Sequence, residues 1–469
     1  MRKKDISYAG VMARRSKILK SSLGIDYGVY ESGSIAFDYG ALMAFGGYGF
    51  DDIRGIQKAV SAGNTPLIEL RNITRLLRQL SPPGKGARVL LKDEACNPSG
   101  SSKERRAAIT CHHAKRAGYK GVVAAAGNSY GMAVAAQAAR QGLRCVVVQE
   151  CYDSRMRCQP EAVEAARKCE ALGAEVLQLS VGPEMFYVFL SILEETGFMN
   201  ASLYSPFGVL GVETLGYEIA RETNEKYGRN PDAVICAHAG GGNVTGTARG
   251  LIRAGAGSAS VIAASVDLRG LDLTSDESYN LKSFTTGHTG SGMPFAADPD
   301  RSDTRRSAAR PLRYMDRYVL VSQGEVFYAT EVLVALEGLE RGPAGNTGLA
   351  AAFSLAREMG QDEILVVQGT EYAGAGRHSQ AQLSFARENG IVIKFGDPGK
   401  NIPGKNIIIP DTPERISAVE QDMGTLRKSL ITNKTKGYPR DSITAGDIAF
   451  LAEETKTDEG FVEAVLNCG

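Results

Sequence analysis

The stretch Asn97-Pro98-Ser99-Gly100-Ser101-Ser102-Lys103-Glu104-Arg105 directly follows the apolar segment 87–92 and is the point around which the predicted fold is built. Its Asn-Pro and Ser-Gly dipeptides predict a tight polar turn between a strand and a helix, with Ser101 or Ser102 as the helix cap. Lys103 is then expected at a helix N-terminus, where the positive end of the helix dipole lowers the pKa of its amine. Such a lysine is a candidate nucleophile for a Schiff base, although an isolated lysine in a turn is more often an ordinary surface residue.

Length and charge predict a large folded protein of two or three domains. The 469 residues carry 54 Lys and Arg against 53 Asp and Glu, a formal net charge of +1. This balance indicates neither nucleic acid nor an anionic membrane as a partner. No apolar run is long enough to cross a bilayer, and the polar start of the chain is unlike a secretory signal. We therefore expect a cytoplasmic protein.

The cysteines and histidines indicate no metal site. The eight cysteines include no C-x-x-C pair, which disfavours zinc and thioredoxin-like sites, and we expect them to be reduced thiols. The five histidines lack metal-ligand spacing apart from the pair His112-His113, and adjacent residues point to different faces of a helix.

Through the middle of the chain, apolar segments of strand length alternate with helical segments. This alternation predicts an α/β fold with parallel, doubly wound sheets in two domains. The expected strands include residues 121–126, 143–148, 175–179, 232–237, 261–266 and 364–367. The expected divisions are an N-terminal extension over 1–60, a larger domain over 61–94 and 208–398 with an irregular insertion at 268–318, a smaller domain over 95–207, and a C-terminal segment over 399–469 that packs on the larger domain.

Three further turns follow predicted strands, at the edge where open α/β sheets bind ligands. The loop Gly240-Gly241-Gly242-Asn243-Val244-Thr245-Gly246 precedes a helix. Its backbone N–H groups, with the side chains of Asn243 and Thr245, can close around an anion. The loop matches neither the dinucleotide nor the Walker pattern, so a single phosphate group is favoured over a nucleotide. Asn128 and Thr370 occupy the other two turns, where each could bond a ligand or cap a helix.

An amine, a hydrogen-bond donor, a phosphate-binding loop and a hydroxyl group are together the groups that a binding site for pyridoxal phosphate requires. In the order and spacing of these segments the chain resembles the fold type II, tryptophan-synthase-beta-like family of pyridoxal-phosphate enzymes, over roughly residues 61–375. Gly63-Asn64-Thr65-Pro66-Leu67 is similar to the family's GNTPL segment, the stretch 97–105 to its NPTGSFKDR segment, and Ala126-Gly127-Asn128 to its SGN segment.

The resemblance implies a role for each of these residues, with the cofactor in the cleft between two doubly wound domains. Lys103 would be the Schiff-base lysine, Asn128 would bond the ring hydroxyl, and the loop Gly240 to Gly246 would hold the phosphate. Thr370 would face the ring nitrogen, with Gln368 as the rival for that position.

The chain departs from the family pattern next to the expected substrate. Ser102 replaces an aromatic residue, Glu104 replaces Asp, and Ser129-Tyr130 replaces a common His or Thr. Tyr130 is a candidate second proton donor, although packing is its more ordinary role. These departures put the family's common synthase and dehydratase activities in doubt.

Within the family, the chain is most similar to the pyridoxal-phosphate subunits of thiolases that degrade amino acids. That similarity implies cleavage of an amino-keto acid by coenzyme A to acetyl-CoA and alanine. It also implies a small α subunit as partner and a homodimer of this chain within the heteromer. The alternative is a β-eliminating or β-replacing enzyme, such as an ammonia-lyase or a relative of threonine synthase. The intact lysine argues against a non-catalytic scaffold.

The insertion carries a dense group of arginines. They could bind the phosphates of coenzyme A or an acidic partner surface, while a solvated loop is the ordinary interpretation of such a charge run. The arginines are Arg301, Arg305, Arg306, Arg310, Arg313 and Arg317.

Overall fold

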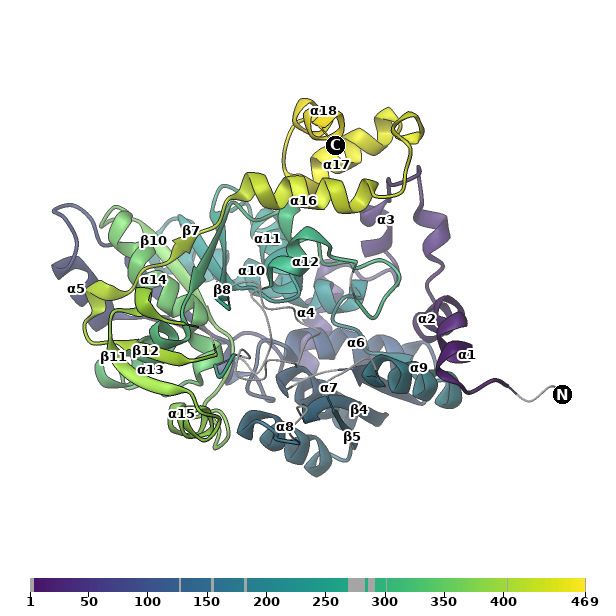
Figure 1. Ribbon diagram of the computed structural model, residues 1–469, viewed down its shortest axis with the longest axis horizontal. Helices are drawn as coiled ribbons and strands as arrows, with labels where there is room; N and C mark the ends of the chain where they lie inside the picture. The colour runs from purple at the N-terminus through teal and green to yellow at the C-terminus, as the bar shows by residue number, and fades with distance from the viewer. Residues whose placement is uncertain are drawn as a thin grey trace.

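The computed structural model describes residues 4–125, 128–152, 156–180, 184–268, 283–285, 292–300, 302–402 and 404–468, with Asn128 described by its backbone alone. Within them the chain forms a seven-stranded, a four-stranded and a separate two-stranded sheet. Helices cover both faces of the two larger sheets (Figure 1). The prediction of an α/β fold with two doubly wound parallel sheets is confirmed. No helix of the described residues is long and apolar enough to span a membrane.

The four-stranded sheet is entirely parallel, in the order β5-β4-β3-β6. Its central strands are rich in buried Val and Ala, as expected of a parallel sheet covered on both faces. Helices α7 and α8 pack on one face and α9 on the other. The elements are β3 (Gly121–Ala125), α7 (Asn128–Gln141), β4 (Arg144–Tyr152), α8 (Pro160–Ala171), β5 (Glu175–Ser180), α9 (Glu184–Thr196) and β6 (Met199–Asn200).

The seven-stranded sheet has the order β1-β2-β10-β7-β8-β9-β13, with antiparallel pairing only at β1 and β13. One face packs on α10 and α11, the other on α5, α13 and α14. The elements are β1 (Leu67–Glu69), α5 (Arg71–Gln79), β2 (Arg88–Asp93), α10 (Pro206–Tyr227), β7 (Ala233–Ala237), α11 (Gly242–Arg253), β8 (Ser260–Val266), β9 (Arg317–Val321), α13 (Gln323–Glu337), α14 (Thr347–Glu358), β10 (Ile364–Gly369) and β13 (Val419–Glu420). Residues 317 and 318, which we assigned to the irregular insertion, belong to β9, whose pairing with β8 draws them into the sheet.

The order of the strands in the seven-stranded sheet determines where the predicted turns lie. Strands β2, β10 and β7 are adjacent and parallel, so their carboxyl ends meet at one edge of the sheet. The lysine segment follows β2, Thr370 follows β10 and the glycine loop follows β7. Helix α6 (Glu104–Arg116) starts at this edge. The fourth turn, at Asn128, follows β3 of the other sheet.

The N-terminal residues pack on the body of the protein. Helices α1 (Tyr8–Ala13) and α2 (Arg15–Leu23) lie against α9, where Arg14 pairs with Glu194 at 2.9 Å. Further along, α3 (Tyr39–Met43) is followed by α4 (Phe50–Ala59), which contacts α6 and α10. Gln57 of α4 is buried and donates its amide to the carbonyls of Arg105 and Gly211, at 3.0 and 2.7 Å.

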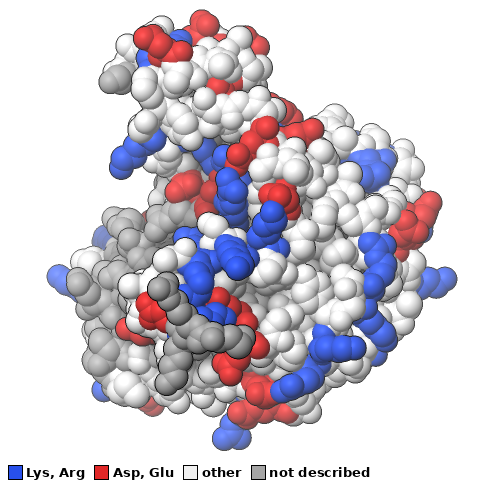
Figure 2. Space-filling view, turned by 90° about the vertical axis from the view of Figure 1, so that its right-hand side faces the viewer, with Lys and Arg blue, Asp and Glu red and all other residues white. Residues whose placement is uncertain are grey.

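The C-terminal helices form a separate layer at one end of the molecule (Figure 1). Figure 2 shows this layer standing out from the body, with basic and acidic side chains intermixed on the face in view, in keeping with the balanced net charge. The remaining elements are α12 (Met293–Ala297), α15 (Ser379–Glu388), β11 (Val392–Gly396), β12 (Asn406–Pro410), α16 (Met423–Thr435), α17 (Ala445–Thr455) and α18 (Glu459–Cys468).

Arg310 and Arg313 of the insertion fasten this layer to the body, so the interpretation of the arginines as part of a solvated loop is wrong at these two positions. Arg310 is 2% exposed in its side chain and pairs with Asp300 at 3.0 Å and with Glu454 of α17. Arg313 pairs with Glu453 at 2.7 Å and also with Glu454. Asp300 and Glu454 are largely buried, whereas the side chain of Glu453 is 67% exposed. The positive charges of Arg310 and Arg313 are thus compensated by carboxylates of this chain. Arg306 pairs with Asp300, Arg305 with Glu31 and Arg317 with Glu420, and Arg301 lies outside the described residues.

The expectation of reduced thiols throughout is wrong at one pair. Cys151 and Cys158 form a disulfide with Cα atoms 5.3 Å apart. The chain turns back after β4 and pairs Tyr152 with Cys158 as an antiparallel bridge, which brings the two thiols together. The other six cysteines are free.

Beneath the lysine segment lies a buried network of charges. Arg105 has no exposed side-chain surface and pairs with Glu94, just after β2, and with Glu218 of α10, both at 2.7 Å. Lys92 of β2 pairs with Glu218 at 3.0 Å and with Glu222 at 2.8 Å. Burial raises the pKa of Glu218, but Arg105 and Lys92 outweigh it and lower that pKa to about 2.

We predict that Arg105→Met destabilises the protein by about 3–5 kcal/mol, because Glu94 and Glu218 would remain buried without their cation. The midpoint of urea unfolding, followed by circular dichroism, measures this. Arg144→Met is the control, since the Arg144–Glu175 pair is 69% and 64% exposed and should contribute less than about 1 kcal/mol. Equal losses in the two variants would contradict the prediction.

The difference between wild type and Arg105→Met should also depend on pH. The pKa of Glu218 is lowered in the folded protein from 4.5 to about 2. The stability that this carboxylate contributes is therefore present above pH 4.5 and is lost as the pH falls from 4.5 toward 2.

Candidate active site

Lys103 occupies the N-cap position of α6, so its predicted place at a helix N-terminus is confirmed. The predicted cap by Ser101 or Ser102 is wrong, because Lys103 itself is the N-cap residue and makes no side-chain cap bond, while Ser101 Oγ accepts from the N–H of Lys103 at 3.3 Å. Instead, Glu104 turns back and accepts a hydrogen bond from the backbone N–H of Ser99 at 3.0 Å. Its other carboxylate oxygen accepts from the amide of Gln137. The turn that carries the lysine is therefore held from inside by a buried carboxylate.

The amine of Lys103 bridges the two large sheets. Its Nζ donates to Ser129 Oγ at 2.6 Å and to Glu371 Oε1 at 2.7 Å. Ser129 lies in the first turn of α7, after β3, and donates to the same Glu371 oxygen at 2.6 Å. Glu371 follows β10 of the seven-stranded sheet. Ser129, one of the residues that depart from the family pattern, therefore contacts the amine of Lys103 directly.

Glu371 is the residue that our sequence interpretation missed. The only signal was an acidic side chain immediately after Thr370 at the end of a buried strand. Burial raises the pKa of Glu371, but Lys103 and Arg377 outweigh it and lower that pKa. Arg377 is 3% exposed, contacts Glu371, and pairs with Glu161 of α8 at 3.0 Å. Charges of alternating sign therefore run from the lysine through the interior to α8.

The glycine loop forms a tight cradle at the N-terminus of α11. Gly241 has a φ of +83°, a left-handed conformation that favours glycine. A Cβ at Gly242 would lie 2.7 Å from Nη1 of Arg106, and one at Gly240 would meet the hydroxyl of Tyr204. The first-turn N–H groups of a helix lack intrahelical partners and can bind an anion. The loop therefore has backbone N–H groups suited to an anion, and the side chains of Arg106 and Tyr204 lie close against its glycines.

The side chains of Asn243 and Thr245 are turned away from this role. Asn243 donates its amide to Ala237 O at 3.2 Å and to Gln368 Oε1 at 2.7 Å. Thr245 donates its hydroxyl to Gly241 O at 2.9 Å. Both side chains stabilise the loop, so the expected side-chain donors to an anion are not available in this arrangement.

The two candidates for the ring nitrogen differ in their surroundings. Gln368 is engaged at both ends, since it accepts from Asn243 and donates to Thr247 Oγ1 at 2.8 Å. Thr370 is tied through its backbone, because its carbonyl accepts from the N–H of Ser102 at 3.1 Å. The structure therefore favours Thr370 over Gln368, and the role of its hydroxyl group stays a prediction.

Asn128 begins α7, directly after β3, but its side chain lies outside the described residues. Tyr130 is 2% exposed and part of the largest apolar cluster. Burial raises its pKa above the ordinary value for tyrosine, which makes it a poor proton donor and favours its packing role. Among the described residues, no group of three or more His, Cys, Asp or Glu side chains could hold a metal ion.

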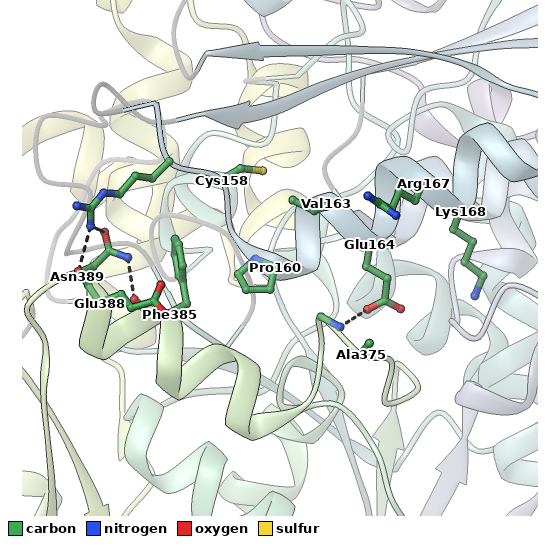
Figure 3. Close-up of a pocket in the computed structure, with 12 residues that line it drawn as sticks. Cys158, Pro160, Val163, Glu164, Arg167, Lys168, Ala375, Phe385, Glu388 and Asn389 are labelled. Atoms are coloured by element: carbon green, nitrogen blue, oxygen red, sulfur yellow. Dashed lines mark hydrogen bonds between the residues drawn. The ribbon is translucent and has the colours of Figure 1, made fainter.

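An open groove of about 1080 Å³ lies between α8 and α15 (Figure 3). Pro160 and Phe385 contribute apolar surface, and Arg167 and Lys168 contribute positive charge. Lys168 lies over the ring of Tyr372 at 4.2 Å and donates to Ser99 O at 3.4 Å. Since Tyr372 follows Glu371 and Ser99 belongs to the lysine segment, the groove borders the elements that hold Lys103.

Comparisons with known proteins agree with this geometry. A family model described as pyridoxal-phosphate dependent enzyme matches residues 59–369. The 2-amino-4-ketopentanoate thiolase beta subunit of Acetoanaerobium sticklandii is 63% identical over 463 residues, 99% of this chain and 98% of that protein. A protein of the same name from an unknown prokaryotic organism is 57% identical over 463 residues, with the same coverage. The crystal structure of maize serine racemase has a TM-score of 0.52 at 19% identity and covers 72% of this chain and 98% of its own, which shows a shared fold.

Proposed function

Because this chain belongs to the pyridoxal-phosphate dependent enzymes, we propose that it is the catalytic subunit that cleaves 2-amino-4-ketopentanoate with coenzyme A to acetyl-CoA and alanine. The observation that carries the substrate is the 63% identity to a thiolase beta subunit over the full chain. A thiolase uses a thiol to break a carbon–carbon bond beside a carbonyl group, and coenzyme A supplies that thiol. The reaction is an acyl transfer and a step of ornithine degradation. We favour it over β-elimination or β-replacement.

The residues present fit pyridoxal phosphate. A lysine amine lies between two sheets, and a glycine cradle lies at the carboxyl edge of the same sheet as the lysine segment. In this proposal Lys103 holds the cofactor covalently, and Gly240, Gly241, Gly242, Asn243 and Thr245 shape the loop for its phosphate. Asn128 and Thr370 are placed to bond the ring. When bound, the cofactor supplies an electron sink that stabilises negative charge next to the substrate amino group.

The neighbours of Lys103 suit an amine that moves protons. With its amine free, Lys103 would be a general base within reach of Ser129 and Glu371. Glu371 stays anionic, because Arg377 supports its charge from the other side. Ser129 connects the amine to the carboxylate at hydrogen-bond distance. These three side chains can thus receive a proton from the substrate and return it.

We assign coenzyme A to the groove between α8 and α15. Arg167 is exposed and has no ion-pair partner in the part of the chain that the structure describes, so its charge is available for a phosphate. The apolar surface of Pro160 and Phe385 suits the uncharged arm that carries the thiol. The volume of about 1080 Å³ lies at the upper end for small-molecule sites. This assignment replaces the insertion arginines, because each of those that the structure describes pairs with a carboxylate of this chain.

The name of the relatives, a beta subunit, supports a small α subunit as partner of this chain. We propose that two copies of this chain form a dimer within that heteromer. A cytoplasmic location agrees with the use of coenzyme A, which is an intracellular metabolite.

Lys103 provides the first test of the proposed function. Lys103→Ala should abolish both the visible absorbance of the bound cofactor and all turnover, because the proposal assigns the covalent bond to the cofactor to this amine. The matched control is Lys115→Ala, an exposed lysine on the same helix, which should keep both. A colourless wild-type protein purified with added pyridoxal phosphate would end the proposal.

The reaction is tested by mixing the chain with 2-amino-4-ketopentanoate and coenzyme A, with and without the small companion protein. We expect alanine and acetyl-CoA in equal amounts, and little turnover when the companion is absent. Release of ammonia without consumption of coenzyme A would instead identify the β-eliminating alternative.

The groove assignment is tested by Arg167→Glu. Reversing this charge should raise KM for coenzyme A by about tenfold, equivalent to about 1.4 kcal/mol, while kcat and KM for the amino acid stay within about twofold. Lys58→Glu is the control, since Lys58 is an exposed lysine of α4, which is not part of the groove. An unchanged KM for coenzyme A in Arg167→Glu would contradict the assignment.

A further inference from the structure

Arg106 is a buried cation without a carboxylate partner in the part of the chain that the structure describes. It lies on α6, three residues after Lys103, and is 8% exposed. Within the described residues its guanidinium donates one long hydrogen bond, to Leu203 O at 3.5 Å. Among the described residues, no carboxylate lies within 4.0 Å of it. The neighbouring Arg105, equally buried, is paired with Glu94 and Glu218.

An unpaired buried charge is expensive. Removing an ion from water costs several kcal/mol unless another charge compensates, and an arginine does not escape by losing its proton. Burial lowers the pKa of Arg106, and the groups that act against burial are the hydroxyls of Tyr130 and Tyr204, not a carboxylate. The position is therefore arranged for an anion that the described residues do not provide.

The guanidinium lies against the glycine cradle. A Cβ added to Gly242 would be 2.7 Å from Nη1 and 3.3 Å from both Cζ and Nη2 of Arg106. Gly242 is the first residue of α11, whose first-turn N–H groups lack intrahelical partners. The hydroxyl of Tyr204 lies against Gly240 of the same loop. A planar cation, a helix N-terminus and a phenol hydroxyl thus lie together at the glycine loop.

These donors match a phosphate monoester. Its dianion has three strong acceptor oxygens, and a guanidinium can bind two of them at once. A helix N-terminus carries only about half a positive charge, so it leaves most of the dianion's charge unbalanced, and an adjacent arginine supplies a further full charge.

We propose that Arg106 binds the phosphate group of the cofactor and compensates its charge. This inference rests on the proposed function, since it takes pyridoxal phosphate as the ligand. It follows that the cost of burying Arg106 is recovered only when the phosphate is bound. The protein should therefore distinguish pyridoxal phosphate from pyridoxal through this residue.

The test uses the full-length apoprotein and two probes, pyridoxal phosphate and pyridoxal, with affinities measured from visible absorbance. Arg106→Met should raise Kd for pyridoxal phosphate by about tenfold to a hundredfold, and Kd for pyridoxal by less than about threefold. Inorganic phosphate should strengthen the binding of pyridoxal to the wild type but not to Arg106→Met. Lys115→Met, an exposed lysine on the same helix, should match the wild type in all three measurements.

A second measurement covers folding. The thermal midpoint of Arg106→Met without cofactor should equal or exceed that of the wild-type apoprotein, because an unpaired buried charge has been removed. The increase in midpoint on adding pyridoxal phosphate should be smaller than in the wild type. A lower apoprotein midpoint, together with equal losses of affinity for the two probes, would show a structural role and overturn the inference.

Two other outcomes would distinguish failure of this inference from failure of the proposed function. If the variant binds pyridoxal phosphate as tightly as the wild type, the inference is wrong while the proposed function stands. If the wild type binds neither probe, the proposed function itself fails, and the inference with it.

Discussion

The buried guanidinium of Arg105 is the constraint on which the position of the lysine depends. It has no exposed side-chain surface and joins Glu94, at the end of β2, to Glu218 of α10. Glu94 in turn accepts hydrogen bonds from Thr65 and Asn97, at 2.5 and 2.9 Å. A Cβ at Gly63 would lie 2.6 Å from Nη1 of Arg105, which explains a glycine there. The segment 63–67 and the turn before Lys103 are therefore held together by the same buried charges. These charges restrict the backbone position of Lys103.

A second charged chain connects the two large sheets. Lys103 and Ser129 reach across to Glu371, which is supported by Arg377, and Arg377 is anchored by Glu161 of α8. Burial raises the pKa of Glu161 to about 7, against the opposing effect of Arg377. The groove that we assign to coenzyme A lies on α8, two turns or less from Glu161. A ligand in the groove and a ligand at Lys103 would thus contact opposite ends of one polar network.

The arginines of this chain have three different roles, although their side chains are chemically identical. Arg310 and Arg313 fasten the C-terminal helices through Glu453 and Glu454. Arg105 positions the lysine segment. Arg106, one residue later, has no carboxylate partner among the described residues and lies against the glycine cradle. The roles of these arginines differ according to whether the fold places a carboxylate close enough to form an ion pair.

The sequence by itself determined the fold class and the place of the main site residues. Alternating strands and helices predict parallel sheets, and polar turns after buried strands predict Lys103, Thr370 and the glycine loop at one edge, because such signals are local in the chain. The partnership of Lys103 with Glu371, 268 residues away, was decided only by the tertiary structure. The same holds for the role of the insertion arginines and the Cys151–Cys158 bridge. The physical reason is that the effect of a charge or a thiol depends on which group folding brings within about 3–4 Å, and no local pattern specifies that neighbour.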